Sequence, residues 1–155
     1  MIVVLYTILH FLVDGICSLI IYNHNYKSFV LAFCVYNFLA FVSQPFIGLL
    51  IDRKRKHKIF LTISVIFIFI GFVINNASYL TLIFLGIGNA FFHIAGGFEV
   101  ARSSDNDIGY LGIFVSTGVI GLTIGRVYNN RLLLIIFSIL LVIMSTDILY
   151  RNRKV

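Results

Sequence analysis

The chain alternates between long apolar runs and short polar breaks. Six apolar runs cover residues 2–22, 29–51, 59–75, 79–98, 108–125 and 132–150. Each run is close to the ~17–25 residues that an α-helix needs to cross a bilayer. Because the breaks are short, consecutive helices should be antiparallel neighbours. The pattern predicts an all-α polytopic membrane protein in which residues 1–155 form a single domain of six transmembrane helices.

The composition agrees with this prediction. Hydrophobic residues make up 60% of the chain and charged residues only 12%, whereas a soluble domain carries about 25% charged residues. So few charges cannot cover a globule with a polar surface, and the lipid bilayer is therefore the expected surrounding. We expect a multi-pass integral protein, in the cell membrane, without a soluble module.

The basic residues predict the orientation of the helices. The net charge of +6 would suggest nucleic-acid binding in a soluble protein, but here it is a topology signal and no nucleic-acid partner is expected. One side of the predicted membrane holds only Lys27, Arg126 and Arg131. The opposite side holds Arg53, Lys54, Arg55, Lys56, Lys58, Arg102, Arg151, Arg153 and Lys154. Since cytoplasmic loops are enriched in Lys and Arg, both termini are predicted to be cytoplasmic.

Polar side chains within the spans indicate which helices face something other than lipid, because such groups are costly in hydrocarbon. The third and sixth spans are apolar over most of their length, as expected for outer helices. The first, second, fourth and fifth spans should line the interior. The candidates for a substrate or proton pathway come from the first, second and fourth: His10, Asp14, Asn37, Gln44, Asn89 and His93.

Two of these polar pairs have helical spacing. His10 and Asp14 lie four positions apart, as do Asn89 and His93, so each pair occupies one helical face. At about 1.5 Å per residue, His10 lies about 12 Å from the cytoplasmic end of its span, near the midplane. If the chain consists of two inverted three-helix units, the two pairs occupy matching places, as in many transporter binding sites. We interpret His10 and Asp14 as a protonatable pair that couples proton and substrate movement; the alternative is a structural pair that holds helices together.

Small residues form stripes on two spans. Gly118, Gly121 and Gly125 share a face of the fifth span, and Gly86 and Gly97 lie on a similar stripe of the fourth. Small stripes let membrane helices approach closely. We expect these glycines to serve helix packing.

Two segments resemble a known family. Gly48, Asp52, Arg53 and Lys56 match the G-x-x-x-D-R-x-G-R-R/K loop signature of the major facilitator superfamily. The segment Gly86-Ile87-Gly88-Asn89-Ala90-Phe91-Phe92-His93, with Ala95-Gly96-Gly97, resembles the fourth helix of its drug-efflux members, especially the fosmidomycin-resistance-like group.

The resemblance covers only the amino-terminal six-helix half of such a transporter. It implies a 3+3 inverted repeat, alternating access, and a cytoplasmic charge network of Asp52 with basic neighbours that Glu99 and Arg102 could join.

These observations together predict a half-transporter for a small molecule, with proton-coupled efflux as its activity. Six helices would leave half of a central cavity open, with Asp14 and His93 exposed, so we expect a homodimer or pairing with a second six-helix half. One alternative is a truncated or accessory subunit that transports nothing itself. Another is an intramembrane metal enzyme built on His10, Asp14 and His93, but no H-E-x-x-H or nucleophile motif accompanies them. The sequence thus predicts no enzyme activity, no metal and no cofactor.

Overall fold

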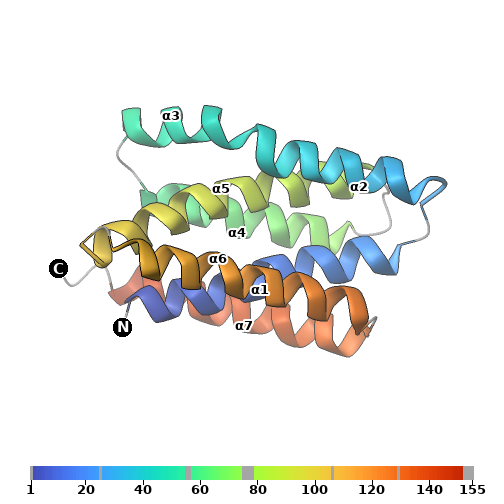
Figure 1. Cartoon of the computed structure of the whole chain (residues 1–155). Helices are drawn as coiled ribbons and strands as arrows, with labels where there is room; N and C mark the ends of the chain where they lie inside the picture. Colours follow the sequence, from blue (N-terminus) through green and yellow to red (C-terminus); the bar gives the residue numbers. More distant parts are fainter. Residues whose placement is uncertain are drawn as a thin grey trace.

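The computed structural model describes residues 2–24, 26–54, 57–74, 79–105, 107–128 and 130–151, without the side chain of residue 151. These residues form a bundle of helices that run side by side (Figure 1) and contain no strand, which confirms the all-α prediction. The elements are α1 (Ile2–Asn23), α2 (Phe29–Asn37), the π-helix η1 (Phe38–Val42), α3 (Gln44–Lys54), α4 (His57–Val73), α5 (Tyr79–Ser103), α6 (Ile108–Val127) and α7 (Arg131–Arg151).

Among the described residues, five helices are long and apolar enough to cross a membrane: Ile2–Asn23, Phe29–Lys54, Tyr79–Ser103, Ile108–Val127 and Arg131–Tyr150. The second of these is the continuous helix made of α2, η1 and α3. The helix α4 is apolar too but has only 17 residues. The chain therefore has the helices of a membrane protein, and they coincide with the predicted apolar runs to within a few residues at their ends.

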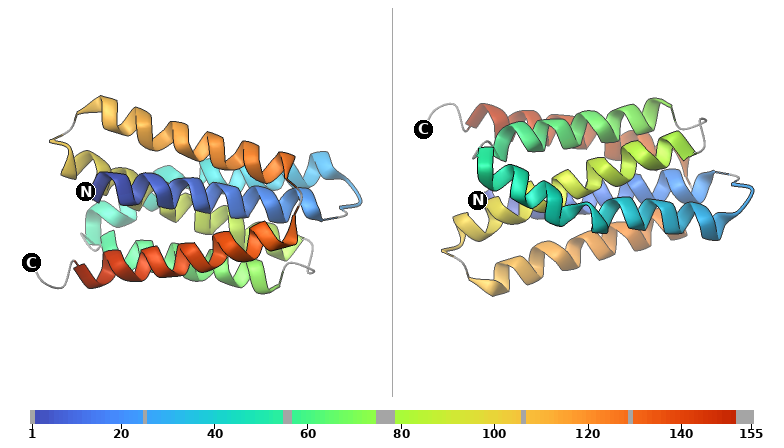
Figure 2. Two further views of the ribbon diagram at one scale, coloured as in Figure 1. Left: turned by 90° about the horizontal axis from the view of Figure 1, so that it is seen from below. Right: turned by 90° about the horizontal axis from the view of Figure 1, so that it is seen from above.

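The centre of the bundle is formed by α1 and α5. In the 18-residue apolar stretch of α1, 72% of the residues are buried, and in that of α5, 56% are buried. The corresponding share is only 22% for both Phe29–Lys54 and α6. The helix α1 packs against α5, α6 and α7, while α5 packs against α1, α4 and the α2–α3 helix; Figure 2 shows α1 lying between α6 and α7 in its left view. The two central helices are the two that carry the paired polar residues.

The contact between α1 and α6 is unusually close because glycines line it. A Cβ atom added at Gly121 would overlap the carbonyl oxygen of Phe11, and one added at Gly125 would lie 2.6 Å from that of Gly15. Two hydrogen bonds cross the same interface. The Ser18 hydroxyl donates to the carbonyl of Leu122 over 2.8 Å, and the Thr117 hydroxyl to that of Thr7 over 3.0 Å. Backbone proximity and interhelical hydrogen bonds are the forces that join helices in lipid.

The helix Phe29–Lys54 is irregular in its middle. Pro45, the only proline of the chain, has no N–H and its ring crowds the preceding turn. The helix widens into the π-helix η1 immediately before it. This segment lies against α5, where a Cβ at Gly86 would come within 2.7 Å of the Leu39 Cβ atom. Such π segments are frequent at functional sites.

Candidate functional site

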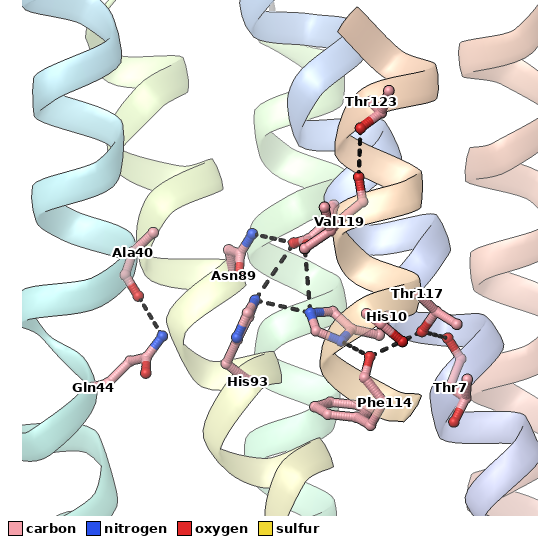
Figure 3. A network of polar contacts seen from close by, with 12 residues as sticks. Thr7, His10, Ala40, Gln44, Asn89, His93, Phe114, Thr117, Val119 and Thr123 are labelled. Atoms are coloured by element: carbon pink, nitrogen blue, oxygen red, sulfur yellow. Dashed lines mark hydrogen bonds and ion pairs between the residues drawn. The ribbon is translucent and has the colours of Figure 1, made fainter. Parts of the chain in front are cut away.

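The two polar pairs meet between α1 and α5. The imidazole Nε2 of His10 lies 3.2 Å from Oδ2 of Asp14 and 3.1 Å from Nε2 of His93. Nε2 of His93 lies 3.5 Å from the other carboxylate oxygen of Asp14. Figure 3 shows His10, Asn89 and His93 pointing toward one another from the two helices. Helical spacing puts both members of each pair on one face, and the packing of α1 on α5 brings the two faces together.

The carbonyl of Phe114 in α6 fixes the orientation of His10. The Nδ1 atom of His10 lies 2.6 Å from that oxygen, and since a carbonyl only accepts, Nδ1 must carry the proton. The imidazole also stacks on the Phe114 ring with 4.2 Å between centroids. Gly118 makes this approach possible, because a Cβ atom there would lie 2.5 Å from both His10 Nε2 and Asp14 Oδ2.

An amide and a phenol support the carboxylate of Asp14. The Nδ2 atom of Asn89 donates to Asp14 Oδ1 over 2.8 Å and to the Tyr36 hydroxyl over 2.6 Å. The Oδ1 atom of Asn89 is buried and has no hydrogen-bond partner among the described residues. Sequence reasoning missed Tyr36, because a tyrosine within an apolar run looks like an ordinary core aromatic residue.

The close contact between His10 and Asp14 requires a proton or a cation between the two side chains. With its proton on Nδ1, neutral His10 presents a lone pair at Nε2, and an ionised carboxylate offers only acceptors. These two acceptors lie 3.2 Å apart in a site where His10 is 1% exposed and Asp14 4%. A proton, carried by His10 Nε2 or by the Asp14 carboxyl group, or a bound cation must lie between them, because the low dielectric of such a site strengthens their repulsion.

A cavity of about 90 Å³ reaches Asp14 from one end of the bundle. Its lining includes Ser18 and Tyr22 on the last turns of α1, Asn37 on α2, and Tyr36 and Asn89 beside the carboxylate. A cavity of this size holds several water molecules. Ser18 and Tyr22 place part of the cavity between Asp14 and the end of the bundle at which α1 ends and α2 begins.

Asn37 and Gln44 were predicted to line the interior because they are polar residues in an apolar span. The structure gives a simpler account of how the span accommodates them. The side-chain amide of Asn37 donates to the carbonyl of Phe33, and that of Gln44 donates to the carbonyl of Ala40. Both acceptors lie four residues earlier in the same helix. Gln44 stands apart from the His10 cluster (Figure 3), and Asn37 reaches only the wall of the cavity. Neither residue contacts the cluster through a hydrogen bond described in the structure.

One expectation about exposure is wrong. Asp14 was expected to face an open half-cavity, but its side chain is 5% exposed within the single chain. Asn89, Tyr36 and Gly118 close around it. Only His93, with 18% of its side chain exposed, is partly open. Burial of Asp14 therefore does not require a partner chain.

Three of the four residues of the predicted loop signature, Gly48, Asp52 and Arg53, lie within α3. Asp52 and Arg53 are exposed, and no ion pair of Asp52 lies within the described part of the chain. No side-chain or backbone atom lies within 4 Å of a Cβ added at Gly48. Lys56 and its neighbour Arg55 lie outside the described residues.

Glu99 and Arg102, the two residues that could join the predicted loop network, form an ion pair with each other. The guanidinium of Arg102 donates to the carboxylate of Glu99 over 2.6 Å. Glu99 is 4% exposed, whereas 59% of the Arg102 side chain is exposed. The ion pair lies in the last turn of α5, just before the polar loop.

The glycines predicted to serve packing have different surroundings. Gly121 and Gly125 meet α1 backbone and Gly86 meets the α2–η1 segment. Gly118 faces the polar cluster itself, a role that sequence alone did not indicate. At Gly97 the nearest atom is 3.8 Å away, so a side chain there would be in ordinary contact.

Comparison of the chain with protein-family models, with curated proteins and with solved structures finds no match. The geometry of the site therefore has to carry the functional argument.

Proposed function

We propose that this chain is a transport domain that moves a small solute across a membrane by alternating access, and that the His10–Asp14–Asn89–His93 cluster handles a cation during each cycle. The observation that carries the proposal is the convergence of three ionisable side chains in the middle of two apolar helices. Ionisable groups at such depth are costly, and they mark ion, substrate and proton pathways.

The access geometry supports this proposal. The cavity reaches Asp14 from the α1–α2 end, while His10 is covered on its other side by the rings of Phe92 and Phe114. A site that borders a cavity on one side and aromatic rings on the other is arranged as one of the two states of alternating access requires. With the orientation predicted from the basic residues, the open side is the external one.

The coupling cation of the proposal is a proton, and the direction is efflux, as expected for the resemblance to drug-efflux members of the major facilitator superfamily. The chain would then be one six-helix half. Its partner would be a second copy or a complementary half, joined along the exposed apolar faces of Phe29–Lys54 and α6. These two helices are the least buried of the long apolar helices described.

A reconstitution experiment tests the function. The full chain is placed in liposomes that contain a pH-sensitive dye, a pH gradient is imposed, and small amphipathic solutes are added one at a time. We expect at least one solute to cause proton flux in the wild type and none to do so in Asp14→Asn. Asp105→Asn is the matched control, because Asp105 is exposed and its positive φ of 51° also suits asparagine.

The outcome separates the proposal from an accessory role. If wild type and Asp14→Asn behave alike for every solute, either without flux or with equal flux, the cluster is not a transport site. An accessory subunit without its own transport would give the first of these results.

A further inference from the structure

We propose that His10, Asp14 and His93 bind a divalent first-row transition-metal ion. The three side chains each offer one ligand atom, and these atoms all lie within 4.8 Å of one another. Ligands at about 2.0–2.1 Å from a tetrahedral zinc ion are separated by about 3.3 Å. The observed separations are 3.1 Å for His10 Nε2 to His93 Nε2, 3.2 Å for His10 Nε2 to Asp14 Oδ2, and 3.5 Å for His93 Nε2 to Asp14 Oδ1. The three ligands are thus already spaced for one ion.

The groups behind the ligands are those that metal sites use. A metal-binding histidine donates its second ring N–H to a carbonyl or carboxylate, which leaves the other nitrogen free for the metal. His10 does this through Nδ1 and the carbonyl of Phe114. Ligating carboxylates are themselves hydrogen-bonded, and Asn89 donates to Asp14. Both supports are independent of the distances between the ligand atoms.

The donor set selects the class of ion. Two imidazoles and one carboxylate suit Zn²⁺, Fe²⁺ or Co²⁺, whereas Mg²⁺ and Ca²⁺ prefer sites made of oxygen ligands. Three protein ligands leave at least one position open. The cavity that borders Asp14 can supply water or solute to that position.

The ion also resolves the electrostatic conflict at this site. A divalent cation between the Nε2 atoms and the carboxylate replaces the repulsion of adjacent acceptors by attraction. The inference does not depend on transport, since a protein that moves no solute can hold the ion equally well. If the transport proposal holds, the ion and the coupling proton compete for the same lone pairs.

Cobalt is the probe of choice for this site. Tag-free full-length protein in lipid nanodiscs is titrated with Co²⁺ and its visible absorption is recorded. We expect one equivalent per chain, with the d–d bands of four- or five-coordinate Co²⁺, displaced by Zn²⁺ and unaffected by excess Mg²⁺. His93→Asn should remove these bands, and Asn89→Ala should weaken binding about 10–100-fold. His24→Asn is the control, because it removes an imidazole on a loop outside the bundle.

A measurement on the wild-type protein tests the metal site even if the variants misfold. X-ray absorption of the zinc-loaded protein should show two imidazole ligands together with oxygen ligands. Absence of stoichiometric Co²⁺ binding, unchanged binding in folded His93→Asn, or a zinc spectrum without imidazole would each overturn the inference. Metal binding without solute flux would instead contradict only the transport proposal, and flux without metal binding would contradict only this one.

Discussion

Replacing Gly121 with alanine should separate α1, which carries His10 and Asp14, from α6, whose Phe114 carbonyl orients His10. The added Cβ would overlap the carbonyl oxygen of Phe11 and lie 3.1 Å from the nitrogen of Gly15. The usual C···O contact is about 3.3–3.6 Å, so α1 and α6 must move apart by about 1 Å. Both close atoms belong to backbone, and a rotamer change therefore cannot relieve the contact.

The expected loss of stability has two parts. Overpacking of a close-packed interface costs about 1–3 kcal/mol. A shift of about 1 Å also breaks the interhelical hydrogen bonds of Ser18 and Thr117, which are now 2.8 Å and 3.0 Å long; such bonds contribute about 0.6 kcal/mol each in membranes. The sum is about 2–4 kcal/mol of lost unfolding free energy.

Gly112→Ala provides the matched control. Gly112 lies on the same helix, and nothing lies within 4 Å of a Cβ placed there. Both substitutions change the helix propensity by the same amount, about 1 kcal/mol in favour of alanine. The difference between the two variants therefore isolates the packing contribution.

The assay is reversible unfolding in mixed micelles followed by far-ultraviolet circular dichroism, because the chain has no tryptophan. We expect the unfolding free energy of Gly121→Ala to lie about 2–4 kcal/mol below that of Gly112→Ala. A difference under about 0.5 kcal/mol, the usual scatter of surface substitutions, would refute the close approach of α1 and α6.

Four further predictions concern the site and its orientation. Gly118→Ala places a methyl group 2.5 Å from His10 Nε2 and Asp14 Oδ2, so Co²⁺ binding should weaken by at least about tenfold while Gly112→Ala binds normally; equal affinities would contradict the position of the ion. Tyr36→Phe removes an acceptor for Asn89 and should cost about 0.6–1.7 kcal/mol of unfolding free energy, against no loss for Tyr110→Phe on the exposed face of α6. Asp52→Asn should impair transport in the proteoliposome assay without reducing membrane insertion. Unchanged transport would contradict the predicted cytoplasmic charge network. A reporter fused after residue 155 should be active only in the cytoplasm, and external activity would invert the predicted topology.

The helices were predictable because each apolar run is long and continuous. The run 79–98 predicted α5, and the structure extends it only to Ser103, where Glu99 and Arg102 form their own ion pair. The apolar run ends at the first charged residue, whereas the helix continues as long as its backbone hydrogen bonds and side-chain pairs are satisfied. For the same reason the run 29–51 gave no sign of η1, since apolar residues at 38–42 fit an α-helix and a π-helix equally well.

The cluster itself was half predictable. Helical spacing grouped His10 with Asp14 and Asn89 with His93, but a single sequence does not state that two helices face each other at the same level. The carbonyl of Phe114 that orients His10 is a backbone group, so the identity of residue 114 gives no indication of this contact. The sequence raised a metal site on His10, Asp14 and His93 only as an alternative, because no H-E-x-x-H or nucleophile motif accompanies these residues. Three ligands on two helices have no fixed spacing in the chain.

Asn37, Gln44 and Asn89 show what separates a functional polar residue from one that is merely satisfied. Asn37 and Gln44 each reach the carbonyl four residues earlier in their own helix, which is possible for any such side chain in a regular helix and needs no partner from elsewhere. Asn89 instead bonds Asp14 of α1 and Tyr36 of α2. The partners of Asn89 are in turn placed by a small residue: Gly118 of α6 leaves room for the His10 and Asp14 side chains, where any larger residue would fill the space. In this chain the polar pair His10 and Asp14 forms a site because a glycine of the facing helix lies at the same depth. The glycine stripe of α6 therefore belongs to the site as well as to the helix packing.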